Sequence, residues 1–251
     1  MNTKIGMFDS GIGGVTVLKE CIKRNPNFEY LYYSDSVHNP YGDRSKEVII
    51  GYCEKIVKSF IHQGCKIIII ACNTASAMAV EYLRDKYTDI HFIAIEPAIK
   101  LAYDTNQNGT LVMATKGTMD SQKFHELFDK YHHDGYYLIS CVGLANLIEN
   151  GNDDKIRNYL YDNLSIYKDR VSNVVLGCTH YPLVKNEIRE VLGDVDFFDG
   201  AIGVSKQLSR IIQENGYIGS HKGSVSFFDS TGDVEKRKRF YQILESDNGG
   251  V

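Results

Sequence analysis

Short apolar runs alternate with longer amphipathic stretches along most of the chain, and this alternation restricts the fold more than any other feature. The run at 66–71 contains four consecutive isoleucines, and the stretch at 75–86 that follows it has helical spacing. Nearly continuous apolar runs are typical of parallel strands that helices cover on both faces. The pattern therefore predicts an α/β protein with mostly parallel sheets. Strands are expected at 4–8, 30–34, 66–71, 91–95, 110–114, 136–141, 173–177 and 224–228, and helices at 15–23, 45–62, 75–86, 120–131, 144–150, 153–161, 183–192 and 205–215.

Two strand ends of the first half recur in the second half at the same distance along the chain. Asp9 and Thr115 each follow an apolar run, as do Cys72 and Cys178, and the members of each pair are 106 residues apart. A shared offset at two junctions indicates an internal repeat. We therefore expect two similar, pseudo-symmetric α/β domains with the active site in the cleft between them. The expected division is 1–96 plus 207–251 for the first domain and 97–206 for the second, with a polar loop at 105–109 near the boundary.

Composition excludes several functional classes. The 251 residues carry 28 Lys plus Arg against 32 Asp plus Glu, a net charge of -4, which is not the basic balance of a nucleic-acid-binding protein. The longest apolar run, 67–72, is far shorter than the roughly 20 residues that span a bilayer. The N-terminus lacks the features of a secretory signal, so we expect a cytoplasmic protein without nucleic-acid or membrane partners. The basic run at 236–239 is expected to be a solvated helix face.

The six cysteines are expected to be free thiols. They form no C-x-x-C pair and no zinc-binding spacing, so neither disulfides nor a metal site is expected. Core packing is the expected role of Cys21, Cys53, Cys65 and Cys141. Cys72 and Cys178 are different because each follows a strand, at the edge of a parallel sheet where ligands bind.

The residues beside these two cysteines are suited to a polar ligand. Asn73, Thr74 and Ser76 supply hydrogen-bond donors after Cys72, while Thr179 and His180 follow Cys178. Two thiols on opposite faces of one carbon can remove a proton from one side and return one to the other, and donors or an imidazole can poise one thiol as a thiolate. A hydrolase instead needs one nucleophile, one base and an oxyanion hole. The symmetric pair therefore favours inversion of a stereocentre.

A glycine-rich turn at 9–14 follows the first strand, and its residues Asp9 and Ser10 are expected to line the same cleft. The turn does not match the dinucleotide fingerprint, because Thr16 occupies the position of the third glycine. Two interpretations remain: a loop whose amides hold a carboxylate or phosphate, or a tight turn in which Asp9 caps the following helix. Residues 40–43 form a further turn signal.

At this point the sequence resembles a known family. The segments at 8–14, 40–42, 71–76 and 176–183, with weaker ones at 95–97, 147–149 and 231–233, are similar to the motifs of glutamate racemases, within the cofactor-independent aspartate/glutamate racemase superfamily. The resemblance implies interconversion of L- and D-glutamate without a cofactor, supply of D-glutamate for peptidoglycan, and a homodimer. His180 favours glutamate, since the sister aspartate racemases typically carry Glu at that position.

The resemblance also implies residue roles. Cys72 would take the α-proton from D-glutamate and Cys178 would take it from L-glutamate, assisted by Asp9 and His180. Glu149 matches an acidic residue near the substrate amino group. The implied substrate-binding set comprises Asp9, Ser10, Tyr41, Gly42, Asn73, Thr74, Glu149, Thr179 and His180.

Three different functions stay open beside this one. The same chemistry acts on aspartate or a related acid; the chain binds an amino acid in its cleft without isomerising it; or it is a Cys-His hydrolase in which Cys178 alone suffices.

Overall fold

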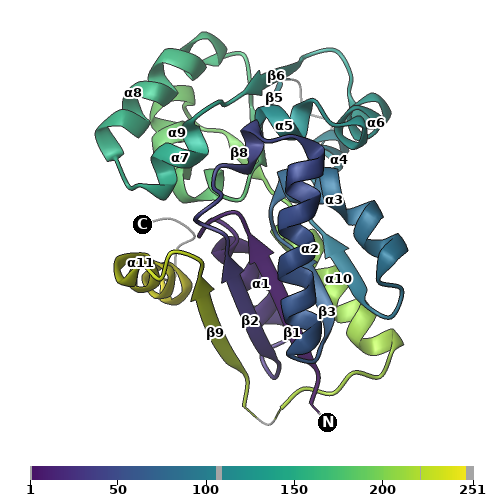
Figure 1. Cartoon of the computed structure of the whole chain (residues 1–251). Coiled ribbons are helices and arrows are strands. Elements are labelled where there is room, and N and C mark those ends of the chain that lie inside the picture. The colour runs from purple at the N-terminus through teal and green to yellow at the C-terminus, as the bar shows by residue number, and fades with distance from the viewer. Residues whose placement is uncertain (1, 106–108, 221, 247–251) are drawn as a thin grey trace.

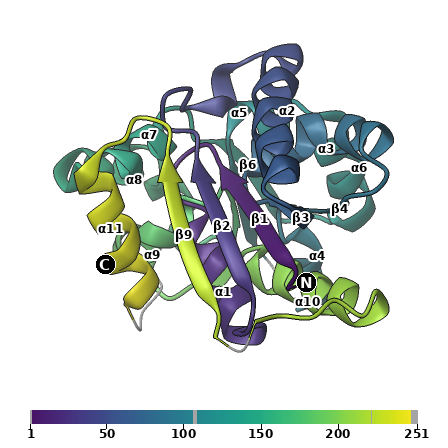
Figure 2. The ribbon, with the colours of Figure 1, turned by 60° about the horizontal axis from the view of Figure 1, so that its bottom comes forward.

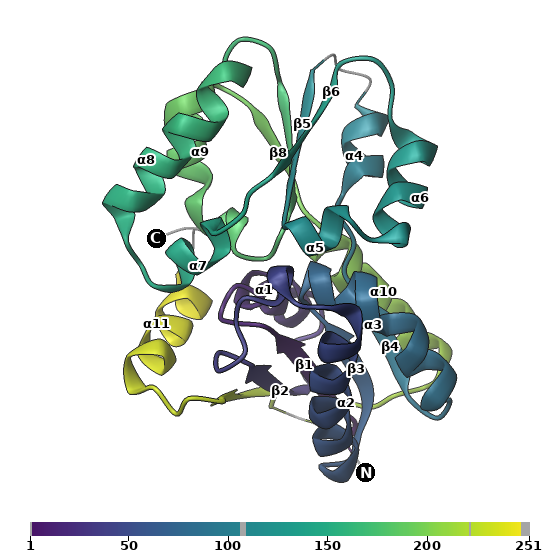
Figure 3. The same ribbon diagram turned by 45° about the horizontal axis from the view of Figure 1, so that its top comes forward.

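The fold comprises two parallel β-sheets, each with helices on both faces. The computed structural model describes residues 2–105, 109–220 and 222–246. Figures 1 and 3 show the two sheets in separate units, one above the other. All strand pairs among the described residues are parallel, so the predicted α/β class is confirmed. The first sheet has the order β4-β3-β1-β2-β9 and the second β6-β5-β7-β8. The strands are β1 (Lys4–Asp9), β2 (Glu29–Ser34), β3 (Cys65–Ile70), β4 (His91–Ala94), β5 (Thr110–Ala114), β6 (Tyr136–Ser140), β7 (Asn173–Gly177), β8 (Asp196–Phe198) and β9 (Ser224–Asp229).

The two sheets have the same internal order. The order β4-β3-β1-β2 in the first sheet corresponds to β8-β7-β5-β6 in the second. In this correspondence β1 matches β5 and β3 matches β7, as the offset of 106 residues predicted. Strand β9 has no counterpart and extends the first sheet beside β2. The predicted domain division stays a prediction; its boundary at 206 falls inside the helix α10, and residues 106–108 of the expected loop lie outside the described residues.

Alternate residues of the first sheet pack into two different layers. Ile68 and Ile70 pack with residues of α2 and α3, while Ile67 and Ile69 pack with residues of α1, α10 and α11. Figure 2 shows these two groups of helices on opposite faces of the sheet. The second layer continues into the other unit and includes residues of β5, β7 and α7–α9. One core therefore joins the two units. The helices are α1 (Val15–Arg24), α2 (Lys46–His62), α3 (Asn73–Lys86), α4 (Ile99–Asp104), α5 (Lys116–Met119), α6 (Gln122–Tyr131), α7 (Leu144–Glu149), α8 (Asp153–Leu164), α9 (Lys185–Leu192), α10 (Ala201–Glu214) and α11 (Val234–Glu245).

Helix capping explains where the structure departs from the expected helices. The helix expected at 120–131 corresponds to α6, which begins only at Gln122 because Ser121 accepts a hydrogen bond from the Phe124 amide and caps it. The short helix α5, which precedes this cap, was not expected. The helix expected at 183–192 begins as a 3-10 turn, Tyr181–Val184, and becomes α9 only at Lys185. No helix within the described ranges is long and apolar enough to cross a membrane.

Candidate active site

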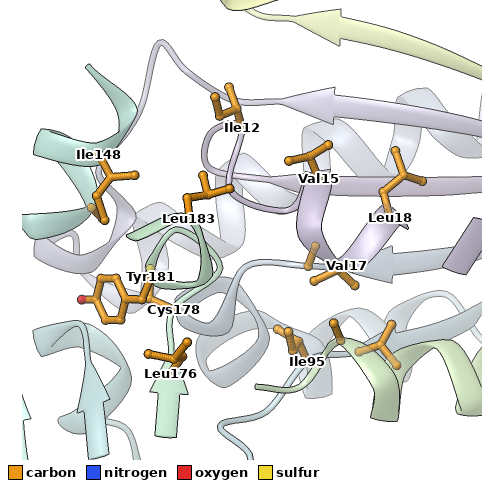
Figure 4. Packing of buried hydrophobic residues seen from close by; sticks show 14 of the residues in the cluster. Ile12, Val15, Val17, Leu18, Ile95, Ile148, Leu176, Cys178, Tyr181 and Leu183 are labelled. Atoms are coloured by element: carbon orange, nitrogen blue, oxygen red, sulfur yellow. The ribbon is translucent and has the colours of Figure 1, made fainter. Parts of the chain in front are cut away.

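The two strand-end cysteines line one cavity between the units. Cys72 immediately precedes α3, and Cys178 follows β7 at the corresponding place. Both are buried, with 5% and 7% of their surface exposed. Figure 4 shows Cys178 at the end of its strand, beside Tyr181 and Leu176. The cavity has a free volume of about 30 Å³, room for about two water molecules.

Most of the predicted site residues face this cavity. Its walls include the predicted residues Ser10, Tyr41, Gly42, Cys72, Asn73, Thr74, Cys178 and His180. Three further predicted residues do not line the cavity in the described structure: Asp9, Glu149 and Thr179. Cys141 has both roles: it belongs to the hydrophobic core, as predicted, and it also lines the cavity.

Cys72 has a buried environment that favours its uncharged form. Its Sγ donates a hydrogen bond to Ser10 Oγ at 3.8 Å. Burial, followed by the negative charge of Asp9, raises the pKa of the Cys72 thiol well above its usual value. In this arrangement Cys72 is a protonated thiol.

Cys178 instead lies beside an imidazole. His180 Nδ1 is 3.8 Å from Cys178 Sγ, and its Nε2 is 2.7 Å from Glu149 Oε2. Burial lowers the pKa of His180, but the hydrogen bonds to Cys178 and Glu149 raise it more, so the net pKa lies well above its usual value. A protonated His180 presents one N–H to the sulfur and the other to the carboxylate. The two thiols of the cavity therefore differ in charge environment.

Glu149 is a buried carboxylate with partners from both units. Its Oε2 accepts hydrogen bonds from His180 and from the Ile12 amide at 3.1 Å. Lys236 Nζ lies 3.1 Å from its Oε1. Burial raises the pKa of Glu149, but His180 and then Lys236 lower it more, to about 2. The carboxylate is therefore ionised, and its partners are groups of the protein.

The glycine-rich turn holds two carboxylates of the protein itself. The Gly14 amide donates to Asp9 Oδ2 at 2.7 Å, and Thr179 Oγ1 donates to the same oxygen at 3.0 Å. The Ile12 amide donates to Glu149. The turn is therefore held by acids of the protein itself: Asp9 binds the Gly14 amide, although no side chain caps α1, and the Ile12 amide binds an acid from the other unit.

The glycines of this turn have no room for side chains. A Cβ at Gly11 would lie 2.4 Å from Glu149 Oε2, and one at Gly13 would lie 2.7 Å from His180 Nδ1. Both distances are shorter than van der Waals contact. The turn therefore requires glycine because the Glu149–His180 pair packs directly against its backbone.

Hydrogen bonds to neighbouring side chains fix two other residues of the cavity wall, Tyr41 and Thr74. Tyr41 Oη donates to Asp35 Oδ2 at 2.6 Å. Thr74 Oγ1 lies 2.9 Å from Thr115 Oγ1 and 3.3 Å from Thr118 Oγ1. Thr115 is the residue that the repeat pairs with Asp9, so the signal for it was present in the sequence.

Sequence reasoning missed the groups that hold these side chains in place. The basic run at 236–239 was expected to be solvated. Arg237 and Lys238 are exposed, but Lys236 contacts Glu149, and Arg239 donates to the carbonyls of Ile148 and Glu149. Their partners are about 90 residues away in the sequence, and no local pattern connects them.

Across the described ranges, the structure contains no group of three or more His, Cys, Asp or Glu side chains arranged to hold a metal ion.

Comparison with known proteins identifies one family. A sequence profile of the Asp/Glu/Hydantoin racemase family matches residues 19–204. The chain is 41% identical to a glutamate racemase of Clostridium perfringens, over 96% of this chain and 97% of that protein. It is 38% identical to glutamate racemase 2 of Bacillus subtilis, over 96% of each chain.

Several solved structures with the same fold are glutamate racemases. The crystal structure of the Francisella tularensis enzyme in complex with D-glutamate matches with a TM-score of 0.83 at 30% identity, over 98% of this chain and 94% of that one. The Escherichia coli enzyme, in complex with L-glutamate and the activator UDP-MurNAc-ala, matches with a TM-score of 0.83 at 25% identity, over 100% and 97% of the two chains. The chain belongs to the Asp/Glu/Hydantoin racemase family, among its glutamate racemases.

Proposed function

We propose that this protein interconverts L- and D-glutamate by proton transfer between Cα and two cysteines. The observation that carries the proposal is the placement of Cys72 and Cys178 at corresponding strand ends on the walls of one cavity. Glutamate as substrate is supported by the relatives and by the glutamate-bound structures. The proposal includes the supply of D-glutamate for peptidoglycan.

The different environments of the two thiols give the order of the steps. With L-glutamate, Cys178, supported by the His180 imidazolium, takes the α-proton as a thiolate, and the Cys72 thiol gives its proton to the opposite face of Cα. The product is D-glutamate, with Cys72 left as the thiolate and Cys178 as the thiol. This is the protonation state from which D-glutamate reacts, so each turnover prepares the reverse direction.

The remaining cavity walls would hold the substrate. Ser10, Asn73 and Thr74 offer hydrogen-bonding groups beside Cys72, and the Asn73 Oδ1 is buried without a hydrogen-bond partner among the described residues. We assign these groups, with Tyr41 and Gly42, to the substrate carboxylates and amine. Asp9, Thr179 and Glu149 hold the site from behind the walls, so we assign Glu149 to His180 rather than to the substrate amine.

Single substitutions test the two-thiol mechanism. Cys72→Ala and Cys178→Ala should each abolish turnover of both enantiomers, because each direction needs an acid and a base on opposite faces. Cys53→Ala, in the core of α2, is the matched control and should retain turnover. Substantial racemisation by either cavity variant would contradict the mechanism. Hydrolytic activity that persists in Cys72→Ala but not in Cys178→Ala would favour a hydrolase that needs Cys178 alone.

Substrate assays distinguish glutamate racemisation from aspartate racemisation and from simple binding. Turnover of glutamate but not of aspartate is expected. Preferential turnover of aspartate would change the substrate and keep the chemistry, whereas tight binding of glutamate without isomerisation would indicate a binding protein. Expression in a bacterium that requires D-glutamate should restore its growth, and the Cys72→Ala variant should not. The homodimer and the cytoplasmic location stay predictions, and light scattering of the purified chain tests the first.

A further inference from the structure

Helix α11 belongs to the first unit but contacts the second unit at the back of the candidate site. The Phe240 ring stacks on Phe227 of β9 at a centroid distance of 4.0 Å, which fixes α11 to the first sheet. At its start, the Asp233 side chain accepts hydrogen bonds from the amides of Glu235 and Lys236. At its end, Lys19 Nζ of α1 donates to the Ile243 carbonyl at 2.9 Å. The middle and the end of α11 are therefore anchored to the first unit, and its start is capped.

Two basic residues of α11 face away from this anchoring and toward α7. Lys236 and Arg239 are three residues apart, so they lie on one face of the helix. Arg239 donates from its two terminal nitrogens to the carbonyls of Glu149 at 2.7 Å and Ile148 at 2.8 Å. These are the final carbonyls of α7, which lack partners within the helix. Arg239 thus fixes the main chain of Glu149.

Lys236 acts on the side chain of the same residue. Its Nζ lies 3.1 Å from Glu149 Oε1 as an ion pair, and within the described part of the chain Oε1 has no hydrogen bond. The Lys236 side chain is 21% exposed, and that of Glu149 is 2% exposed. With Oε1 held by Lys236, Oε2 is directed to the Ile12 amide and to His180 Nε2. The orientation of the imidazole beside Cys178 therefore depends on α11.

We propose that Lys236 and Arg239 are positioning residues, which hold Glu149 so that its carboxylate orients His180 beside Cys178. The inference rests on the proposed function, since it assigns these residues to the environment of one of the two thiols. Neither side chain touches the cavity. Their effect passes from α11 through Glu149 and His180 to the Cys178 sulfur.

The basic run itself supplies matched controls. Lys238 and Arg237 are exposed neighbours of the same residue types, on the same helix. Lys236→Met is compared with Lys238→Met, and Arg239→Gln with Arg237→Gln. Lys236→Arg keeps a positive group that can reach Glu149 Oε1, so it is the conservative rescue variant.

Kinetics of both enantiomers give the first readout. Lys236→Met and Arg239→Gln should lower kcat roughly tenfold or more, with KM changed far less, since misplacing a catalytic group affects chemistry more than binding. Because the equilibrium constant of racemisation is one, kcat/KM should fall equally in the two directions. Lys236→Arg should restore most of the activity, and both control variants should match the unaltered protein.

A spectroscopic readout is independent of activity. The imidazole Nε2–H of His180, assigned through its loss in His180→Gln, should give a downfield proton resonance because of the 2.7 Å contact with Glu149. This resonance should move upfield or disappear in Lys236→Met and Arg239→Gln, and persist in the controls and in Lys236→Arg. If the unaltered protein does not racemise glutamate, the proposed function fails while the resonance still tests the positioning role.

Two results would overturn the inference. One is a Lys236→Met protein with the kcat and the His180 resonance of the Lys238→Met control. The other is a loss of kcat that follows only the unfolded fraction, with an unchanged resonance in the folded protein and no rescue by Lys236→Arg. The second result would show that α11 contributes to stability alone.

Discussion

At the scale of single residues, the two halves of the repeat have diverged around equivalent thiols. Cys72 is paired with a hydroxyl, Ser10, whereas Cys178 is paired with an imidazole, His180. If the two thiols had identical environments, nothing in the site would determine which of them is ionised. The observed asymmetry gives the site one neutral sulfur and one supported by a cation, which a two-base mechanism requires at the start of each turnover.

The glycine-rich turn gives a prediction about packing. Gly13→Ala would bring a Cβ to 2.7 Å from His180 Nδ1. We expect a loss of about 1–3 kcal/mol in the free energy of unfolding, together with a fall in kcat because His180 moves. Gly203→Ala is the control: it lies in α10 with nothing within 4 Å of the added Cβ, so helix propensity should stabilise it by about 0.5–1 kcal/mol. Denaturant unfolding and racemase assays of both variants check this, and equal behaviour would contradict it.

The Glu149–His180 pair predicts a pH dependence of stability. The lowered pKa of Glu149 gives stability above its usual value of 4.5, which is lost as pH falls toward about 2. The raised pKa of His180 gives stability below its usual value of 6.5, which is lost as pH rises through the higher value of the folded state. Glu149→Gln should therefore be less stable by about 3 kcal/mol between these limits, and the difference should shrink on either side.

Urea unfolding of both proteins from about pH 3 to pH 8 measures that difference. A difference that stays constant across the range would show that the pair does not titrate as described.

The sequence indicated the two cysteines of the cavity but not the groups that support them. Cys72 and Cys178 were predictable because each ends a strand and the two share an offset. The role of Glu149 was not, because its partners Ile12 and Lys236 lie far away in the chain. Contacts between distant segments depend on how the elements pack, which no local pattern records.

At the scale of elements, strands were predicted best where apolar residues are continuous. The strands at 110–114 and 173–177 have the bounds that were expected. The strand β8 was missed because it has only three residues, and α4 because its six residues are too few to show a helical period. The motif at 231–233 proved to be the cap of α11, with Asp233 as its acceptor.

Helix capping gives the prediction for α11. Asp233→Ala should cost about 1 kcal/mol of stability, and it should also lower kcat because α11 carries Lys236 and Arg239. Asn152→Ala removes the side-chain cap of α8, which accepts from the Lys155 amide, and should cost a similar free energy without lowering kcat. Thermal unfolding and kinetics of the two variants check this. A fall in kcat of the same size in both would mean that capping of α11 has no specific link to the site.

At the scale of the whole molecule, the two units close over the cavity that the two cysteines line. Its free volume is about 30 Å³. Polar contacts, including Thr179 with Asp9 and Thr74 with Thr115, lie beside it, while an apolar core also joins the two units. Polar contacts between domains permit relative motion more readily than apolar ones. We expect the units to separate for substrate entry and to close afterwards, which would exclude water from the thiols.

Solution scattering checks this motion. The radius of gyration should be larger without ligand than with saturating glutamate, because the bound amino acid favours closure. An identical radius in both conditions would mean that the units do not move as rigid bodies.

The central claim is that two thiols act on opposite faces of Cα, and racemisation in deuterated water tests it most directly. Starting from L-glutamate, the first D-glutamate formed should carry solvent deuterium at Cα, while the remaining L-glutamate stays unlabelled, since the group that protonates the product is not the one that took the substrate proton. D-glutamate that retains the original hydrogen, or label that enters both enantiomers equally from the start, would contradict the account.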